Sequence, residues 1–152
     1  MQHDLGLNVL GGRTHTLICG AGALDPGVVE WFQSLKINGK SLSFLSGYGS
    51  TETGNLAQNR KMLPHVEWKL LEQEGFDITQ GEGELVVKTG AMMFEGYANQ
   101  PHKTTSACTP DGFYKMGDTV RITLPEGVEH WDFTQPISGI GVWVDVLGRQ
   151  SG

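Results

Sequence analysis

A short segment that begins at Gly47, GYGSTETG, brings an aromatic ring, hydroxyl groups and a carboxylate close together. Gly47 and Gly49 flank Tyr48, so the backbone can approach a ligand closely while the ring offers a flat face to a purine base. Thr51 could donate a hydrogen bond to a phosphate oxygen, and Glu52 could hold a Mg²⁺ ion that neutralises phosphate charge. A tight strand-to-helix turn, with Tyr48 packed on the core and Thr51 capping the helix, explains the same residues equally well.

A second acidic group, Asp118, follows a glycine in the run DGFYKMGDTVRI. We expect it at the start of a strand, where a carboxylate can accept hydrogen bonds from both hydroxyls of a ribose. As an isolated feature, however, a Gly-Asp turn is more often simply structural. The residue therefore becomes a site candidate only together with the GYGSTETG segment.

The turn Gly20-Ala21-Gly22 also follows an expected strand. It has the Gly-x-Gly spacing of a dinucleotide-binding turn, but the third glycine is replaced by Asp25, whose charge would face a pyrophosphate. The sequence also lacks the Gly-x-x-x-x-Gly-Lys-Ser/Thr loop that cradles a triphosphate. An ordinary turn at a strand end is the favoured interpretation, and a dinucleotide oxidoreductase rests on this turn alone.

These candidates need elements to position them. The run THTLIC, residues 14–19, predicts a buried strand, and Asp25 and Pro26 predict the start of a helix that ends near Gly39. A second strand is expected over residues 42–45, opening into the glycine loop. A strand, helix and strand in this order favour a parallel pair with a right-handed crossover.

The rest of the chain has a different sequence pattern, dominated by short β-prone runs. HVEWKLLE, GELVVKT and VWVDVLG are short β-rich runs separated by turn residues, so they predict a small sheet or distorted barrel. NQPHKTTSACT could hold a short helix, and residues 123–139 are typical of a loop. The predicted fold class is α/β: residues 1–55 end a mostly parallel α/β subdomain that carries the nucleotide and Mg²⁺ motif, and residues 56–152 form a β-rich subdomain.

Composition narrows the function classes. The 152 residues are 38% hydrophobic and 18% charged, with a formal net charge of -6, which suits one globular domain and gives no basic excess for nucleic acid. No apolar run is long enough to span a membrane. Cys19 and Cys108 lack disulfide-framework or metal-ligand spacing, so we expect a cytoplasmic protein.

Taken in order, these passages resemble the adenylate-forming (AMP-binding) superfamily, which includes acyl-CoA synthetases, luciferases and the adenylation domains of peptide synthetases. The likeness covers nearly the whole chain through LGGRTHTLICGAGALDP, SGYGSTETG, GEGELVVKTGAMMFEGYANQP, DGFYKMGDTVRI and VWVDVLGR. GYGSTET is its most specific element. In detail the passages look most like the adenylation domain of carboxylic acid reductases and related long-chain acyl-CoA synthetases, and the last of them would end at the hinge to a further domain.

The resemblance implies a role for each candidate. Tyr48 would stack on adenine, and the catalytic groups would be Thr51 at the α-phosphate and Glu52 as the Mg²⁺ ligand. Asp118 and Arg149 would hold the ribose. The adenine and acyl pocket would be lined by Gly20, Ala21 and Gly22.

The implied reaction joins a carboxylic acid, such as a fatty acid, to AMP from ATP, and then passes the acyl group to the thiol of CoA or of a phosphopantetheine arm. The sequence departs from the family pattern in three ways. Met116 stands where the threonine of the usual Arg-Thr-Gly-Asp turn is expected, and neither the lysine-bearing phosphate loop nor the C-terminal domain with its catalytic lysine is present in these residues.

Because of these departures, we expect a fragment that is incompetent by itself and that self-associates through an exposed sheet edge. The alternative is a non-catalytic interaction module on the same fold.

Overall fold

The computed structural model describes residues 10–20, 25–71 and 79–149. The chain divides into two compact units, Met1–Gly47 and Tyr48–Gly152. The functional division expected from the sequence, with its boundary after residue 55, stays a prediction. Among the described residues, no helix is long and apolar enough to cross a membrane.

The first unit contains a strand, a helix and a strand, as the sequence predicts, but the first strand is not buried as expected, since Ile18 is 78% exposed. Strands β1 and β4 pair in parallel, from Thr16 opposite Ser43 to Cys19 opposite Ser46. The Asp25 carboxylate accepts a 2.7 Å hydrogen bond from the amide of Gly27 and so caps the helix. The elements are β1 (Thr16–Cys19), α2 (Pro26–Ser34), β2 (Lys36–Ile37), β3 (Lys40–Ser41) and β4 (Ser43–Ser50).

Helix α2 ends earlier than the sequence predicts, at Ser34 rather than near Gly39. Asn38 and Gly39 both have positive φ, 53° and 76°, and form the tight turn of the β2–β3 hairpin. This extended path lets Leu35 and Ile37 enter the small core of the first unit together with Leu42.

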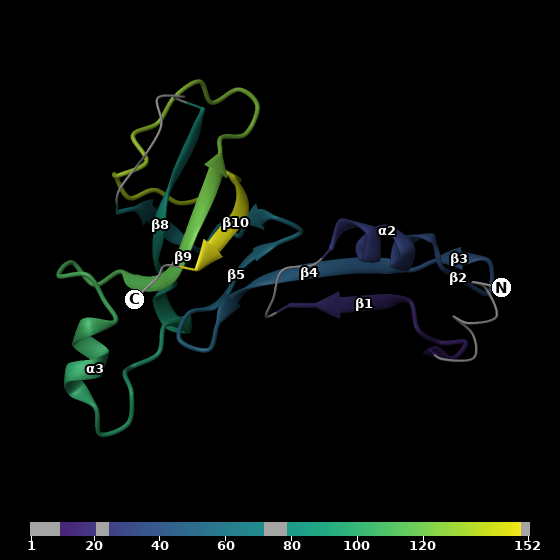
Figure 1. Ribbon diagram of the computed structural model, residues 1–152, viewed down its shortest axis with the longest axis horizontal. Coiled ribbons are helices and arrows are strands. Elements are labelled where there is room, and N and C mark those ends of the chain that lie inside the picture. The colour runs from purple at the N-terminus through teal and green to yellow at the C-terminus, as the bar shows by residue number, and fades with distance from the viewer. Residues whose placement is uncertain (1–9, 21–24, 72–78, 150–152) are drawn as a thin grey trace. The chain divides into compact units, whose positions relative to one another are not determined.

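The second unit is built on a sheet whose order is β5-β6-β10-β9-β8-β7, with antiparallel neighbours (Figure 1). The β-rich second half predicted from the sequence is confirmed. Strand β10 is the latest in sequence yet lies between β6 and β9. The strands are β5 (Gly54–Gln58), β6 (Lys61–Met62), β7 (Glu67–Leu70), β8 (Gln80–Lys88), β9 (Tyr114–Thr123) and β10 (Trp143–Arg149).

One face of this sheet carries the core. Buried residues from most of the strands pack there against the segment that joins β9 to β10, whose Phe133 is fully buried. The rings of Trp68 and Phe133 lie 6.1 Å apart. Gly81 lies beneath the Phe133 ring, and a Cβ atom at this position would come within 2.7 Å of the ring. The joining segment lacks helices and longer strands, as predicted for residues 123–139.

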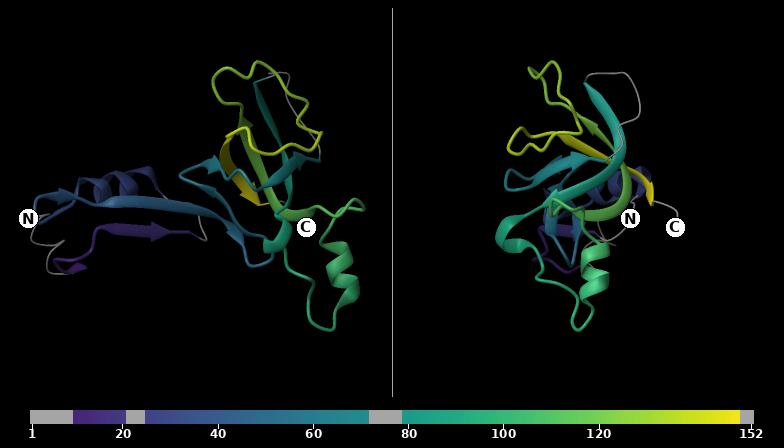
Figure 2. Two further views of the ribbon diagram at one scale, coloured as in Figure 1. Left: turned by 180° about the vertical axis from the view of Figure 1, so that it is seen from behind. Right: turned by 90° about the vertical axis from the view of Figure 1, so that its left-hand side faces the viewer.

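The connection from β8 to β9 carries the helical turns of the second unit, η1 (Gly90–Met92) and α3 (Pro101–Ser106). Figure 2 shows that α3 projects beyond the end of β8 and β9 in both views. The short helix predicted in NQPHKTTSACT is confirmed. This connection also passes beside the turn between β4 and β5, where the sequence places the acidic motif.

Candidate active site

Two of the predicted site residues meet in the second unit although they are 70 positions apart in the sequence. The hydroxyl of Tyr48 donates a 2.7 Å hydrogen bond to a carboxylate oxygen of Asp118. The Tyr48 side chain is half-buried and packs against the core. Burial, followed by the hydrogen bond to Asp118 and its negative charge, raises the pKa of the Tyr48 hydroxyl well above its ordinary value. The tyrosine is therefore a neutral donor at physiological pH.

Asp118 lies within strand β9 and not at its start, which corrects the sequence prediction. The strand pairing is irregular on both sides of this residue: the register with β8 shifts between Glu84 and Val86, and the register with β10 shifts between Val146 and Gly148. Gly117, with φ of 76°, supplies the positive φ that this bulged stretch of β9 requires. Bulges of this kind re-aim side chains.

The acidic residue of the motif lies on the turn between β4 and β5. Partial burial raises the pKa of Glu52, but its own backbone amide and the nearby hydroxyls of Tyr97, Ser50 and Tyr114 stabilise the ionised carboxylate. Their stabilising effect outweighs the burial and leaves the pKa below its ordinary value. Neighbouring Thr51 is exposed. Glu52 is therefore an ionised carboxylate held in a defined place.

The glycine motif folds differently from the predicted loop. Strand β4 continues through GYGS to Ser50, and the turn that follows leads into strand β5 rather than a helix. A Cβ atom at Gly49 would collide with the carbonyl oxygen of Gly54. The close approach of two strands therefore explains Gly49, and the strand-to-helix alternative for this segment is wrong.

The remaining predicted residues have separate positions. Gly20 follows β1 in the first unit, where a Cβ atom would lie 3.3 Å from the carbonyl oxygen of Gly47. Arg149 is exposed at the end of β10, and its Cα atom is paired in register with Asp118. Ala21 and Gly22 lie outside the described residues.

Two tyrosines near Glu52 were missed by the sequence analysis. The Tyr97 hydroxyl donates a 3.0 Å hydrogen bond to Glu52 Oε1 and lies 3.5 Å from the hydroxyl of Tyr114. Burial, the contact with Tyr97 and the charge of Glu52 raise the pKa of Tyr114. The ring of Phe94 packs edge-on against both tyrosines. The signal in the sequence was the aromatic residue after a glycine in GYANQP, but nothing local connects it to the acid.

The chemistry of these donors fits a nucleotide-bound magnesium ion. Mg²⁺ is usually bound by one or two carboxylates together with substrate phosphates and water, so a single ionised carboxylate such as Glu52 is a suitable protein ligand. Within the described ranges, no group of three or more His, Cys, Asp or Glu side chains could hold a metal by itself. Any ion at Glu52 would therefore depend on the phosphates and water for its other ligands.

No family model matches the chain. The carboxylic acid reductase of Mycobacterium tuberculosis is 33% identical over 140 residues, which cover 87% of this chain and 12% of that protein. The enzyme of the same name from Segniliparus rugosus is 32% identical over 133 residues, covering 83% of this chain and 11% of that protein.

The solved structures that the chain resembles come from the same group of enzymes. The A-PCP didomain of the Segniliparus rugosus carboxylic acid reductase, in complex with AMP, matches with a TM-score of 0.70 and 28% identity over 97% of this chain and 19% of that chain. A malonyl-CoA ligase with methylmalonyl-CoA and AMP bound matches with a TM-score of 0.62 and 25% identity over 98% of this chain and 30% of that chain. The chain belongs to the adenylate-forming superfamily. It spans only 12% and 11% of the two carboxylic acid reductases.

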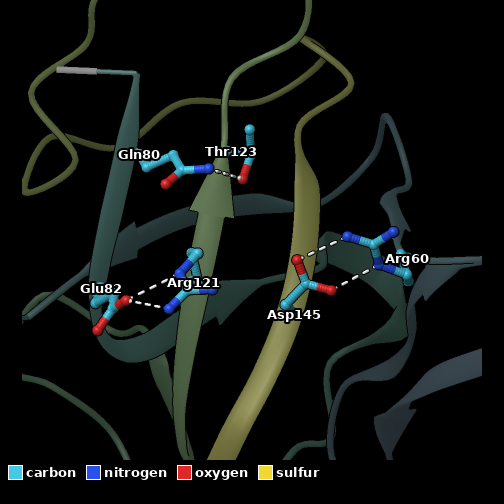
Figure 3. A network of polar contacts seen from close by, with 6 residues as sticks. All are labelled: Arg60, Gln80, Glu82, Arg121, Thr123 and Asp145. Carbon is cyan, nitrogen blue, oxygen red and sulfur yellow. Dashed lines mark hydrogen bonds and ion pairs between the residues drawn. The ribbon is translucent and has the colours of Figure 1, made fainter. Parts of the chain in front are cut away.

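The chain has a second polar region (Figure 3), on the face of the sheet opposite the core, because Arg121 alternates along β9 with the core residues Val120 and Ile122. Arg60 pairs with Asp145 through two hydrogen bonds of 2.6 and 2.7 Å, and Arg121 pairs with Glu82. Arg60, Arg121 and Asp145 line an open hollow of about 360 Å³ beside Trp143. Because both of these arginines are paired with carboxylates, the described residues that line the hollow carry no unpaired charge.

Proposed function

We propose that this chain carries part of the nucleotide site of an enzyme that activates a carboxylic acid with ATP. The acid would attack the α-phosphorus to give an acyl adenylate and pyrophosphate, and a thiol would then take the acyl group. The observation that carries the proposal is the 2.7 Å hydrogen bond from Tyr48 to Asp118. The bond holds an aromatic ring, which could stack on adenine, next to a carboxylate, which could accept hydrogen bonds from the ribose hydroxyls.

The proposed role of each residue follows from its chemistry. Tyr48 offers its ring to adenine, and Asp118 accepts from the ribose hydroxyls, with Arg149 on the neighbouring strand. Exposed Thr51 is free to approach the α-phosphate, and Glu52 holds Mg²⁺. Bound Mg²⁺ would neutralise negative charge on the phosphate oxygens.

The proposal also concerns which carboxylic acid is activated and which thiol takes the acyl group. Long-chain-fatty-acid–CoA ligase 1 of Homo sapiens is 28% identical over 131 residues, and the A domain of the Segniliparus rugosus enzyme was solved with AMP and a co-purified carboxylic acid. These two relatives support a carboxylic acid as the substrate, and the first of them supports a fatty acid in particular. CoA and a phosphopantetheine arm both remain acceptors in the proposal.

We expect the 152-residue chain to bind nucleotide without turning it over. The 152 residues contain neither the lysine-bearing phosphate loop nor the catalytic lysine that the family carries in its C-terminal domain. Positive groups of this kind stabilise the charge that develops on the phosphate in the transition state and so contribute heavily to the rate. Binding without pyrophosphate release would also fit a non-catalytic module. Adding back the rest of a homologous enzyme distinguishes the two, because only a true fragment would then restore turnover.

The test is calorimetric titration of the chain with AMP, with and without Mg²⁺. Tyr48→Ala should weaken AMP binding about tenfold or more, since stacking of a base on an aromatic ring is worth about 1–3 kcal/mol. Glu52→Ala should abolish the effect of Mg²⁺ while leaving metal-free AMP binding nearly unchanged. Glu82→Gln is the matched control, because Glu82 belongs to the second polar region and not to the proposed nucleotide site. It should bind AMP like the unmodified chain. Absence of AMP binding, or equal binding by all variants, would refute the proposed site.

A further inference from the structure

The turn that carries Glu52 is fastened at several points by the segment between β8 and α3. The carbonyl oxygen of Glu52 accepts a 2.7 Å hydrogen bond from the amide of Phe94. The carbonyl oxygen of Thr53, the next residue, accepts a 2.7 Å bond from the hydroxyl of Thr89. Both main-chain anchors restrain the turn itself, but neither reaches the carboxylate.

The carboxylate is restrained by a different residue of the same segment. Tyr97 donates a 3.0 Å hydrogen bond to Glu52 Oε1. A glutamate has several freely rotating side-chain bonds, so a backbone anchor alone leaves its oxygens mobile. The bond from Tyr97 fixes one oxygen and leaves lone pairs on the carboxylate for a further partner.

Tyr97 is itself firmly held. Its amide donates a 2.8 Å hydrogen bond to the hydroxyl of Thr104 on α3, and its ring packs edge-on against Phe94 with the centroids 5.0 Å apart. The ammonium group of Lys103, also on α3, lies 4.6 Å from the centroid of the Tyr97 ring. Helix α3 therefore fixes the position of the phenol, and the phenol fixes the acid.

We infer that Tyr97 is a positioning residue that orients Glu52 toward a nucleotide-bound divalent cation. The inference rests on the proposed function, because that function gives Glu52 its metal. Partners that orient a metal ligand through a hydrogen bond commonly contribute 10- to 100-fold to metal affinity, about the size of effect expected for this hydroxyl.

The first test needs no ligand. Magnetic resonance on chain labelled with ¹³C at glutamate can measure side-chain couplings of Glu52, whose signals are assigned by their loss in Glu52→Gln. Tyr97→Phe keeps the ring and removes the hydroxyl, so the couplings should change from those of one rotamer to a rotamer average. Ser106→Ala, which removes an α3 hydroxyl bonded within its own helix, is the control and should leave the couplings unchanged. Unchanged couplings in Tyr97→Phe would overturn the inference.

The second test uses Mn²⁺ with AMP, followed by paramagnetic broadening of the Glu52 carboxylate signal. Tyr97→Phe should need about 10- to 100-fold more Mn²⁺ for half-maximal broadening. Equal broadening in both proteins would overturn the inference, as would the absence of broadening at Glu52 in the unmodified chain. Failure to bind AMP would instead count against the proposed function, and the ligand-free couplings would still show whether Tyr97 orients the acid.

A variant with a different chemical change guards against misfolding. If Tyr97→Phe fails to fold, Thr104→Val removes the acceptor of the Tyr97 amide and loosens the same ring by another route. It should produce the same averaging of the Glu52 couplings. Retention of a single Glu52 rotamer in folded Thr104→Val would overturn the inference.

Discussion

The Tyr48 hydroxyl and the Asp118 carboxylate form a 2.7 Å hydrogen bond that links strand β4 to the bulged stretch of β9. The bond joins the start of the second unit to its central strands. It also takes up one acceptor site of a carboxylate that retains others for a ligand. The pair therefore has a structural role that can be measured without any nucleotide.

Tyr48→Phe should lower the free energy of unfolding by about 1.5 kcal/mol, since hydrogen bonds to charged groups contribute about 1.5–3 kcal/mol and this pair is only partly buried. Urea denaturation followed by fluorescence measures the change. The double variant with Asp118→Ala should lose little more than Asp118→Ala alone, because the two groups share one interaction. Fully additive losses would show that the bond contributes nothing.

Gly81→Ala should destabilise the second unit by about 1–3 kcal/mol, because the new methyl group would be forced against the buried ring of Phe133. Thermal or urea unfolding of the purified variant gives the value. Gly148→Ala is the matched control: it also adds one methyl group to a strand glycine, but no atom lies within 4 Å of the added Cβ. Similar losses in both variants would contradict packing as the cause.

Acid should weaken the fold partly through Asp111. The hydrogen bond from Lys69, followed by that from Thr109, lowers the pKa of Asp111 from 3.8 to about 2. A group whose pKa is lower in the folded state stabilises the fold above its unfolded pKa, and that contribution disappears as the pH falls through the folded value.

The stability difference between the unmodified chain and Asp111→Asn should therefore be largest above pH 3.8 and should shrink toward pH 2. Urea midpoints measured across this range test the prediction. A difference that stays constant with pH would contradict it.

The ion pair between Arg121 and Glu82 should contribute little to stability. Both side chains are about two-fifths exposed, at 42% and 40%, and exposed pairs usually couple by about 0.2–1 kcal/mol. A double-mutant cycle with Arg121→Met and Glu82→Gln should give a coupling energy in that range, and added salt should reduce it. A larger, salt-insensitive coupling would mean that this face is less exposed in solution than in the structure.

Strand β1 provides a test of the expected self-association. Among the described residues it pairs only with β4, and Ile18 on this strand is 78% exposed. An open strand edge with an exposed apolar side chain favours pairing with another copy. Ile18→Lys should shift the chain toward monomer in sedimentation, whereas Lys40→Ala, on the hairpin of the same unit, should not. A monomeric unmodified chain would refute the expectation.

Local chemistry made part of the fold predictable from the sequence. Asp25 and Pro26 mark the start of α2 because a capping carboxylate and a fixed φ act within one turn. The β5–β6 hairpin was missed because its turn residues, Asn59 and Arg60, both have positive φ without the usual glycine. Arginine gives no signal for such a turn, and the hairpin is too short to show a pattern.

The candidate site was only partly predictable for a different physical reason. The sequence suggested that Tyr48 and Asp118 belong together, but the bulges beside Asp118 depend on the register of β9 with β8 and β10, which no local pattern encodes. The contact of Tyr97 with Glu52 joins residues 45 positions apart. Such contacts depend on tertiary folding and become visible only in three dimensions.

The position of β10 between β6 and β9 has a consequence for biosynthesis. While the chain emerges from the ribosome, β6 and β9 must wait with unpaired edges until residues 143–149 leave the exit tunnel. Non-local strand pairing of this kind forms slowly and leaves unpaired strand edges, which favour aggregation, on the nascent polypeptide. The second unit should thus complete its sheet only after residues 143–149 have been synthesised, and while it waits it would be a natural client for chaperones.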